Sequence, residues 1–110
     1  MKKVTKENLI KTNNKISQLK KENEVLESNI DNLNKEIRNK DQILEDCKME
    51  YNLLVSSSFP LEIKAYPFDV LIRNLNYYSK KIKKLNAIKR KTIKKRIKIE
   101  DKINKLSKLR

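Results

Sequence analysis

A heptad repeat of apolar residues runs through the first half of the chain and constrains the fold more than any other feature. Its a positions are Leu9, Ile16, Asn23, Ile30, Ile37, Leu44 and Tyr51. Its d positions are Thr12, Leu19, Leu26, Leu33, Lys40, Cys47 and Leu54. Eleven of these fourteen positions are apolar, and this three-four spacing predicts a coiled-coil helix over residues 9–55.

The composition also indicates long helices. The 110 residues include no Gly and two Pro, so few residues favour tight turns. Charged residues make up 38% of the chain and aromatic residues 5%, which leaves little material for a compact core. We therefore expect an all-α protein whose buried surface is a seam between helices.

Residues 56–67 interrupt the repeat and predict a bend or linker. Three serines come first, and Pro60 and Pro67 then enclose a segment in which apolar and polar residues alternate. This segment is compatible with a short strand, a loop or a single helical turn. Pro67 suits the first turn of a second helix, predicted over residues 68–110. Residues 1–8 are polar and are expected to fray.

The charges beside the seam argue against an extended parallel coiled-coil oligomer, which is the alternative architecture. In a parallel dimer, Lys15 of one chain would face Lys20 of the other, and Glu22 would face Glu27. Both contacts join like charges and are destabilising. We therefore predict a long two-helix antiparallel coiled-coil hairpin.

Folding the chain back at the bend brings opposite charges together instead. Paired residue numbers would then sum to about 123 in an antiparallel arrangement. The predicted neighbours are Glu27 with Arg96, Glu36 with Lys89, Asp41 with residues 81–84, and Lys20 and Lys21 with Glu100 and Asp101. Each exposed pair contributes little, so the consistent sign is the argument.

The positive charge is concentrated in residues 80–98. This stretch holds eleven Lys or Arg in nineteen positions and no acid. Of the net charge of +14, residues 1–55 supply +1 and residues 56–110 supply +13. Such asymmetry suggests an anionic partner, either a nucleic acid or an acidic protein. An AT-rich genome would also enrich Lys without selection for binding.

We expect the basic helix to contact the phosphate backbone of RNA or DNA without sequence specificity, because Lys dominates and bidentate base recognition by Arg is not indicated. The candidate phosphate-binding residues are Lys80, Lys83, Lys84, Lys89, Arg90, Lys91, Lys94, Lys95, Arg96 and Lys98. A membrane surface is a weaker alternative, since no Trp or Phe accompanies the lysines. A solvated coiled-coil edge without an anionic partner is the third interpretation.

The aromatic residues are confined to the region around the bend. They are Tyr51, Phe59, Tyr66, Phe68, Tyr77 and Tyr78. They predict either a small core at the bend or an interface for a partner protein. In the second case the chain would be a protein-only scaffold or spacer that binds partner helices through its seam and its aromatic bend.

Enzymatic chemistry is not expected. The chain has no His, and it has no Gly for a phosphate-binding loop. Its single Cys47 lies on the apolar seam, where a small buried hydrophobic side chain is the simpler interpretation. We expect no cofactor and no metal site.

The sequence therefore predicts a non-enzymatic coiled-coil assembly subunit. We expect it to belong to a larger assembly or a homo-oligomer. No transmembrane segment is expected, because the longest aliphatic runs have three residues, and no apolar segment resembling a signal peptide follows Met1. An intracellular, soluble protein is the resulting expectation.

Overall fold

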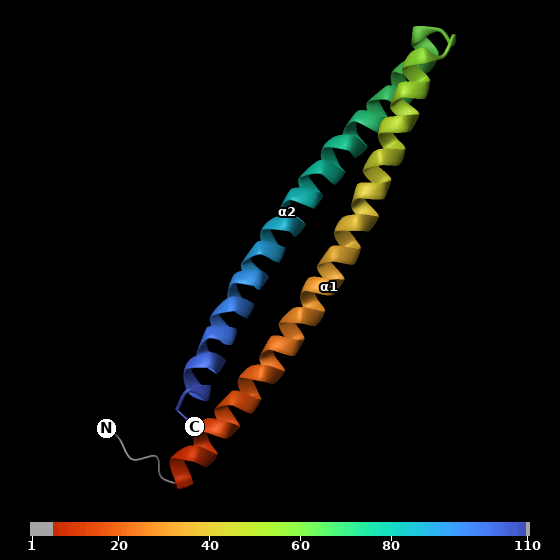
Figure 1. The fold of residues 1–110 in the computed structure, drawn as a ribbon. Helices are drawn as coiled ribbons and strands as arrows, with labels where there is room; N and C mark the ends of the chain where they lie inside the picture. Colours follow the sequence, from red (N-terminus) through yellow and green to blue (C-terminus); the bar gives the residue numbers. More distant parts are fainter. Residues whose placement is uncertain (1–5, 110) are drawn as a thin grey trace. The chain divides into compact units, whose positions relative to one another are not determined.

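A computed structural model describes residues 6–109, which form two helices, α1 (Lys6–Ser56) and α2 (Leu61–Ser107) (Figure 1). The helices pair in opposite directions, so the chain is an all-α helical hairpin, and the predicted fold class is confirmed. Its contacts divide it into two units, one of residues 1–32 with 89–110 and one of Leu33–Ile88. Neither helix has a stretch apolar and long enough to cross a membrane.

The burial of α1 follows the predicted heptad. All fourteen a and d positions are buried or half-buried, including the polar Thr12, Asn23 and Lys40. At the remaining positions of α1, only Asn34 and Ile43 are half-buried, and the others are exposed. The seam of α1 is therefore the surface that the sequence predicted.

The seam of α2 keeps the same three-four spacing along the helix. The buried or half-buried residues in this row are Phe68, Leu71, Leu75, Tyr78, Ile82, Leu85, Lys89, Thr92, Arg96, Ile99, Ile103 and Leu106. Outside the row, the half-buried residues of α2 are Lys64, Pro67, Val70, Asn74, Asn86, Ala87, Ile93 and Ser107. The apolar spacing loosens between residues 88 and 99 because polar side chains occupy three consecutive seam positions there. Ile88 and Ile97 are correspondingly exposed.

Each unit has a small apolar core of its own. Ile16 and Leu19 are buried in the unit of residues 1–32 and 89–110. Cys47, Leu71 and Leu85 are buried in the unit Leu33–Ile88. Such thin cores are expected where two helices alone bury one stripe each.

The bend between the helices is short and needs no glycine, since no residue in the range 6–109 has a positive φ. The last carbonyls of α1 are bonded by serines instead. The hydroxyl of Ser56 donates to the carbonyls of Asn52 and Leu53, at 2.9 and 3.2 Å, and the Ser57 hydroxyl donates to that of Leu54 at 2.9 Å. The carbonyls of Leu53 and Leu54 are among the last four of α1, which the helix itself leaves without N–H partners.

The second helix begins earlier than the sequence predicted. Pro60 precedes the first turn, and its carbonyl accepts the N–H groups of Ile63 and Lys64 at 3.0 and 3.2 Å. The segment 61–67, assigned to the bend, is therefore helical, and Pro67 lies inside α2 and not in its first turn. Proline at the position before the helix restricts the backbone without removing a helical hydrogen bond.

The helix ends also differ slightly from the expectation. Residues 6–8, predicted to fray, are helical, whereas residues 1–5 lie outside the described part of the chain. At the other end α2 finishes at Ser107, and residue 110 is likewise outside the described part.

Candidate nucleic-acid interface

Most of the predicted phosphate-binding residues lie on the face of α2 that is opposite the seam. We call these seven exposed side chains the outer-face cations, and they are Lys80, Lys83, Lys84, Arg90, Lys91, Lys94 and Lys98. The first three belong to the unit Leu33–Ile88 and the other four to the unit that contains residues 89–110. Within each group the residues follow helical spacing, so neighbouring side chains share one side of α2.

Two of the ten candidates lie on the seam instead. Lys89 and Arg96 are half-buried, at positions where the three-four spacing places core residues. Arg96 Nη2 lies 3.5 Å from Oε2 of Glu27, so the predicted neighbourhood of these two residues is confirmed. The sequence prediction did not place these two residues on the seam, because it used only the spacing of apolar residues. Continuing the three-four spacing from Leu85 regardless of residue type would have placed them there.

The last candidate, Lys95, lies beside the seam. It lines a groove between the two helices together with Ile99 and Lys102 from α2. Lys95 therefore shares a groove with apolar residues of both helices, and we do not count it among the outer-face cations.

The other predicted charge pairs have different outcomes. Lys20 and Glu100 line one cavity of about 270 Å³ and thus lie close together, as predicted, although no ion pair joins them among residues 6–109. Asp41, predicted to lie near residues 81–84, likewise forms no ion pair with another described residue.

The outer-face cations are not neutralised by acids in the part of the chain that the structure describes. Its ion pairs join Lys48 to Glu45, Arg73 to Asp69 and Arg96 to Glu27. The first two are local pairs within one helix, and only the third joins α1 to α2. The acids of α1 therefore leave the seven outer-face side chains as a set of unpaired positive charges.

The aromatic residues do not form a single core. The rings of Tyr51 and Phe68 pack edge-to-face across the two helices, with centroids 5.2 Å apart. Tyr77 and Tyr78 make a similar contact at 5.1 Å, but Tyr77, Phe59 and Tyr66 are exposed. The expected small core at the bend is therefore limited to the first pair.

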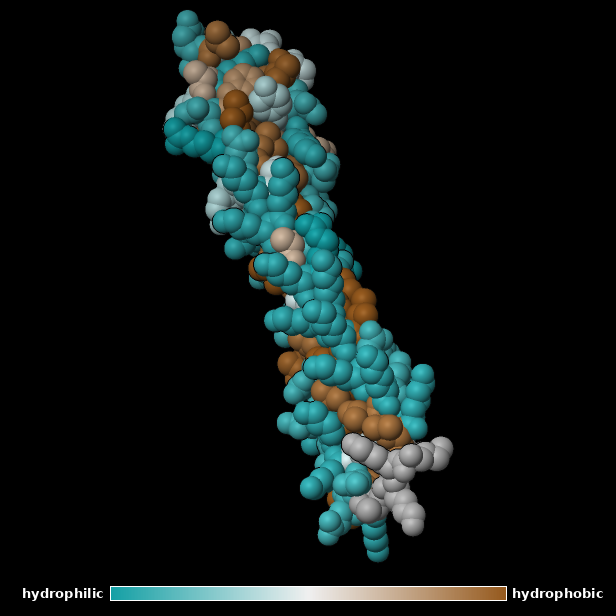
Figure 2. Space-filling model, turned by 90° about the vertical axis from the view of Figure 1, so that its left-hand side faces the viewer, coloured by the Kyte–Doolittle hydropathy of each residue, from teal (hydrophilic) through white to brown (hydrophobic). Residues whose placement is uncertain are grey.

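Apolar side chains near the bend are exposed to solvent. Leu61 and Tyr66 are the most accessible of them, with 75% and 77% of their surface exposed. In Figure 2, hydrophobic side chains are visible at the upper end, where the bend lies in Figure 1, and others appear between hydrophilic ones lower on the same face. This exposure is a second surface feature besides the basic face.

No metal-binding cluster is found in the described range of 6–109, since no three His, Cys, Asp or Glu side chains lie where they could share a metal ion. Cys47 is a buried free thiol. Burial, with a smaller contribution from the negative charges of Glu50 and Asp46, raises the pKa of this thiol above its ordinary value. A raised pKa disfavours the thiolate that nucleophilic chemistry requires.

Comparison with known proteins identifies no matching family model, no similar curated protein and no similar solved structure.

Proposed function

We propose that this chain is a non-enzymatic coiled-coil assembly subunit that docks RNA or DNA through the outer face of α2. The phosphate backbone would contact the outer-face cations, and the bases would remain unread. Binding would be electrostatic, since Lys and Arg that neutralise phosphates release counterions from the nucleic acid.

The observation that supports this proposal is that the cations of α2 lie on two different faces, the seam and the outer face. Arg96, which lies on the seam, has the acid Glu27 beside it, whereas the outer-face cations have no acid partner among residues 6–109. A basic helix that served only to hold the hairpin together would place its charges where Arg96 lies. The seven outer charges do not stabilise the seam and are free to bind a polyanion.

A protein-only scaffold is the second candidate function, and the exposed apolar bend supports it. Phe59, Leu61, Ile63 and Tyr66 are exposed close together in the sequence. Solvent-exposed apolar groups that cluster in this way are typical of surfaces that contact a partner protein. On this account the positive charge of α2 only keeps the chain soluble.

Nucleic-acid binding measured against salt separates the two functions. Fluorescence anisotropy with a labelled duplex DNA and a labelled single-stranded RNA would follow binding between about 50 and 200 mM salt. We expect the affinity for the duplex to fall with a log–log slope of about −3 or steeper, which corresponds to three or more neutralised phosphates. A slope near zero, or no binding at the lowest salt, would refute the nucleic-acid proposal and favour the scaffold.

A further inference from the structure

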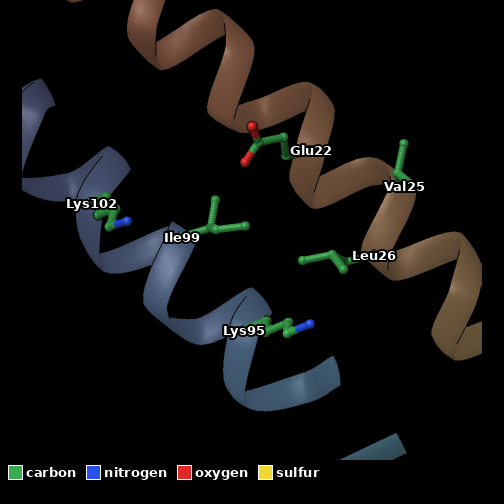
Figure 3. Close-up of a pocket in the computed structure, with 6 residues that line it drawn as sticks. All are labelled: Glu22, Val25, Leu26, Lys95, Ile99 and Lys102. Atoms are coloured by element: carbon green, nitrogen blue, oxygen red, sulfur yellow. The ribbon is translucent and has the colours of Figure 1, made fainter. Parts of the chain in front are cut away.

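A groove with an apolar floor runs between the helices of the unit formed by residues 1–32 and 89–110. One part has a volume of about 480 Å³ and is lined by Glu22, Val25, Leu26, Lys95, Ile99 and Lys102 (Figure 3). In Figure 3 the side chains of Leu26 and Ile99 point toward one another between the helices. A neighbouring part of about 340 Å³ is lined by Lys15, Leu19, Lys102, Lys105 and Leu106. Lys102 lines both parts, so they adjoin one another, and together we call them the lysine groove.

The rim of the lysine groove is basic and its floor is apolar. Its charged residues are four lysines and one glutamate, namely Lys15, Lys95, Lys102, Lys105 and Glu22. Leu19, Leu26, Ile99 and Leu106 supply the floor, and Val25, 61% exposed, widens the apolar surface at the α1 edge. On α1 the groove extends from residue 15 to residue 26, which is about 16 Å, or three turns of a helix.

The opposite side of the same unit has a different chemistry. Its cavity of about 270 Å³ is lined mainly by polar and acidic side chains, with one lysine and one isoleucine, namely Asn23, Asn104, Glu24, Glu27, Glu100, Lys20 and Ile103. Of these two sides, the lysine groove is the one that combines an apolar floor with a basic rim. That combination matches a third helix with one apolar stripe and acidic residues beside it, because the stripe would fill the floor and the acids would meet the lysines.

We propose that the lysine groove binds an amphipathic, acidic helix of a partner protein and so completes a three-helix bundle. A second copy of this chain is disfavoured as the occupant, since a symmetric contact would place four lysines against four lysines. A net charge of +14 also opposes the approach of another copy and favours that of an acidic helix. Nucleic acid fits the groove poorly, because its phosphates would meet the apolar floor. The proposal concerns a surface other than the outer face of α2 and does not depend on the proposed nucleic-acid binding.

The test uses the full chain and three synthetic helical peptides of equal length. The first has Leu at its seam positions and Glu beside them; the second replaces each Glu with Lys; the third replaces each Leu with Asn. We expect the acidic peptide alone to bind, with a Kd of about 1–100 μM, as befits a short helix with a small interface. Equal binding of the acidic and basic peptides, or no binding of the acidic one at about 1 mM, would overturn the proposal.

Matched variants locate the site. Lys95→Glu with Lys102→Glu should weaken binding of the acidic peptide at least about tenfold, whereas Lys91→Glu with Lys98→Glu changes the net charge equally and should leave it within about threefold. Val25→Asn should weaken binding as well, and Ile97→Asn, an exposed apolar residue on the outer face, should not. Equal effects of the paired variants would contradict the proposal. So would a wild-type dimer in sedimentation that Val25→Asn converts to a monomer, because a second copy would then occupy the groove.

Discussion

Polar side chains on the seam are the residues whose roles depend most on their surroundings. Asn23 Oδ1 and Arg96 Nε are buried without a hydrogen-bond partner among the described residues. A buried polar atom without a partner loses its hydration and gains nothing in return. Asn at an a position is known to lower coiled-coil stability while restricting the register. We infer that these two residues weaken the unit of residues 1–32 and 89–110 and limit how its helices can slide.

Replacing Asn23 with Leu should stabilise the chain. The change removes the buried unpaired oxygen and extends the apolar seam, so the free energy of unfolding should rise by about 1–2 kcal/mol in urea denaturation. The control is Asn32→Leu, at an exposed position of α1, which should alter stability by less than about 0.5 kcal/mol. A loss of stability in Asn23→Leu would contradict the assignment of Asn23 as an unsatisfied seam residue.

Cys47 should make stability depend on pH in the alkaline range. Burial raises the pKa of its thiol, so the folded chain holds this proton more tightly than the unfolded chain does. The contribution of this protonated thiol to the free energy of unfolding is fully present below the ordinary thiol pKa of about 8.5. It is lost as the pH rises through the raised pKa of the folded chain. Urea denaturation between about pH 7 and 10.5 would compare the wild type with Cys47→Ala. The stability difference should be constant at neutral pH and shrink above the ordinary pKa; an unchanged difference would contradict the raised pKa.

At the scale of the helices, the sequence predicted α1 more accurately than α2. The seam of α1 was predictable because apolar residues occupy eleven of its fourteen positions. The seam of α2 was harder to predict because it includes three half-buried polar residues, Lys89, Thr92 and Arg96. A search for apolar spacing does not find such residues. The early start of α2 was missed because two prolines around residues 61–66 resemble the limits of a loop.

The candidate site was predictable only in part. The charge run identified the basic helix, but which cations face outward follows from the seam register, which separates Lys89, Lys95 and Arg96 from the other seven candidates. The lysine groove was not predicted, because a groove needs the facing residues of two helices and their register. Phe59 and Tyr66 are exposed although their residue types favour burial, and nothing in their spacing indicated this.

Pro67 should limit the stability of α2 near the bend. It lies inside the helix and has no N–H to bond the carbonyl of Ile63, four residues earlier. Pro67→Ala should therefore raise the free energy of unfolding by about 1–3 kcal/mol. The unfolded chain gains conformational freedom when proline is removed, and this effect reduces the increase. Pro60→Ala is the control, because Pro60 precedes the first helical turn and lacks no helical bond. Equal stabilisation by both changes would contradict this account.

At the scale of the whole molecule, antiparallel pairing recurs in each of the two units. Glu27 contacts Arg96 in one unit, and Tyr51 contacts Phe68 in the other. The numbers of Glu27 and Arg96 sum to 123, as the predicted register requires, whereas those of Tyr51 and Phe68 sum to 119, about one helical turn away from it. The ion pair therefore supports the predicted register, and the aromatic pair supports the antiparallel direction of the two helices.

Spin labels at residues 38 and 84 would test the pairing in solution. Both positions are exposed and belong to the unit Leu33–Ile88, and Cys47→Ala removes the native thiol. The hairpin predicts a separation of about 10–25 Å, whereas one continuous helix would separate the labels by about 70 Å. Dilution with unlabelled chain should leave the distance distribution unchanged, and a distance beyond about 40 Å, or one that disappears on dilution, would contradict the hairpin.

The central claim for the whole molecule is that nucleic-acid binding depends on where the positive charges lie and not on their total. Two variants with the same loss of three positive charges separate these possibilities. One is Lys84→Gln, Lys91→Gln and Lys98→Gln, all outer-face cations of α2. The other is Lys11→Gln, Lys21→Gln and Lys35→Gln, all exposed on α1.

The most direct measurement is the salt dependence of duplex DNA binding by the wild type and these two variants. The account predicts that the α2 variant binds at least about tenfold more weakly at low salt and that its log–log slope is shallower by about 2–3 units. The α1 variant should keep a slope within about one unit of the wild type. Equal losses in the two variants, or no loss in the α2 variant, would contradict the claim that the outer face of α2 is the nucleic-acid interface.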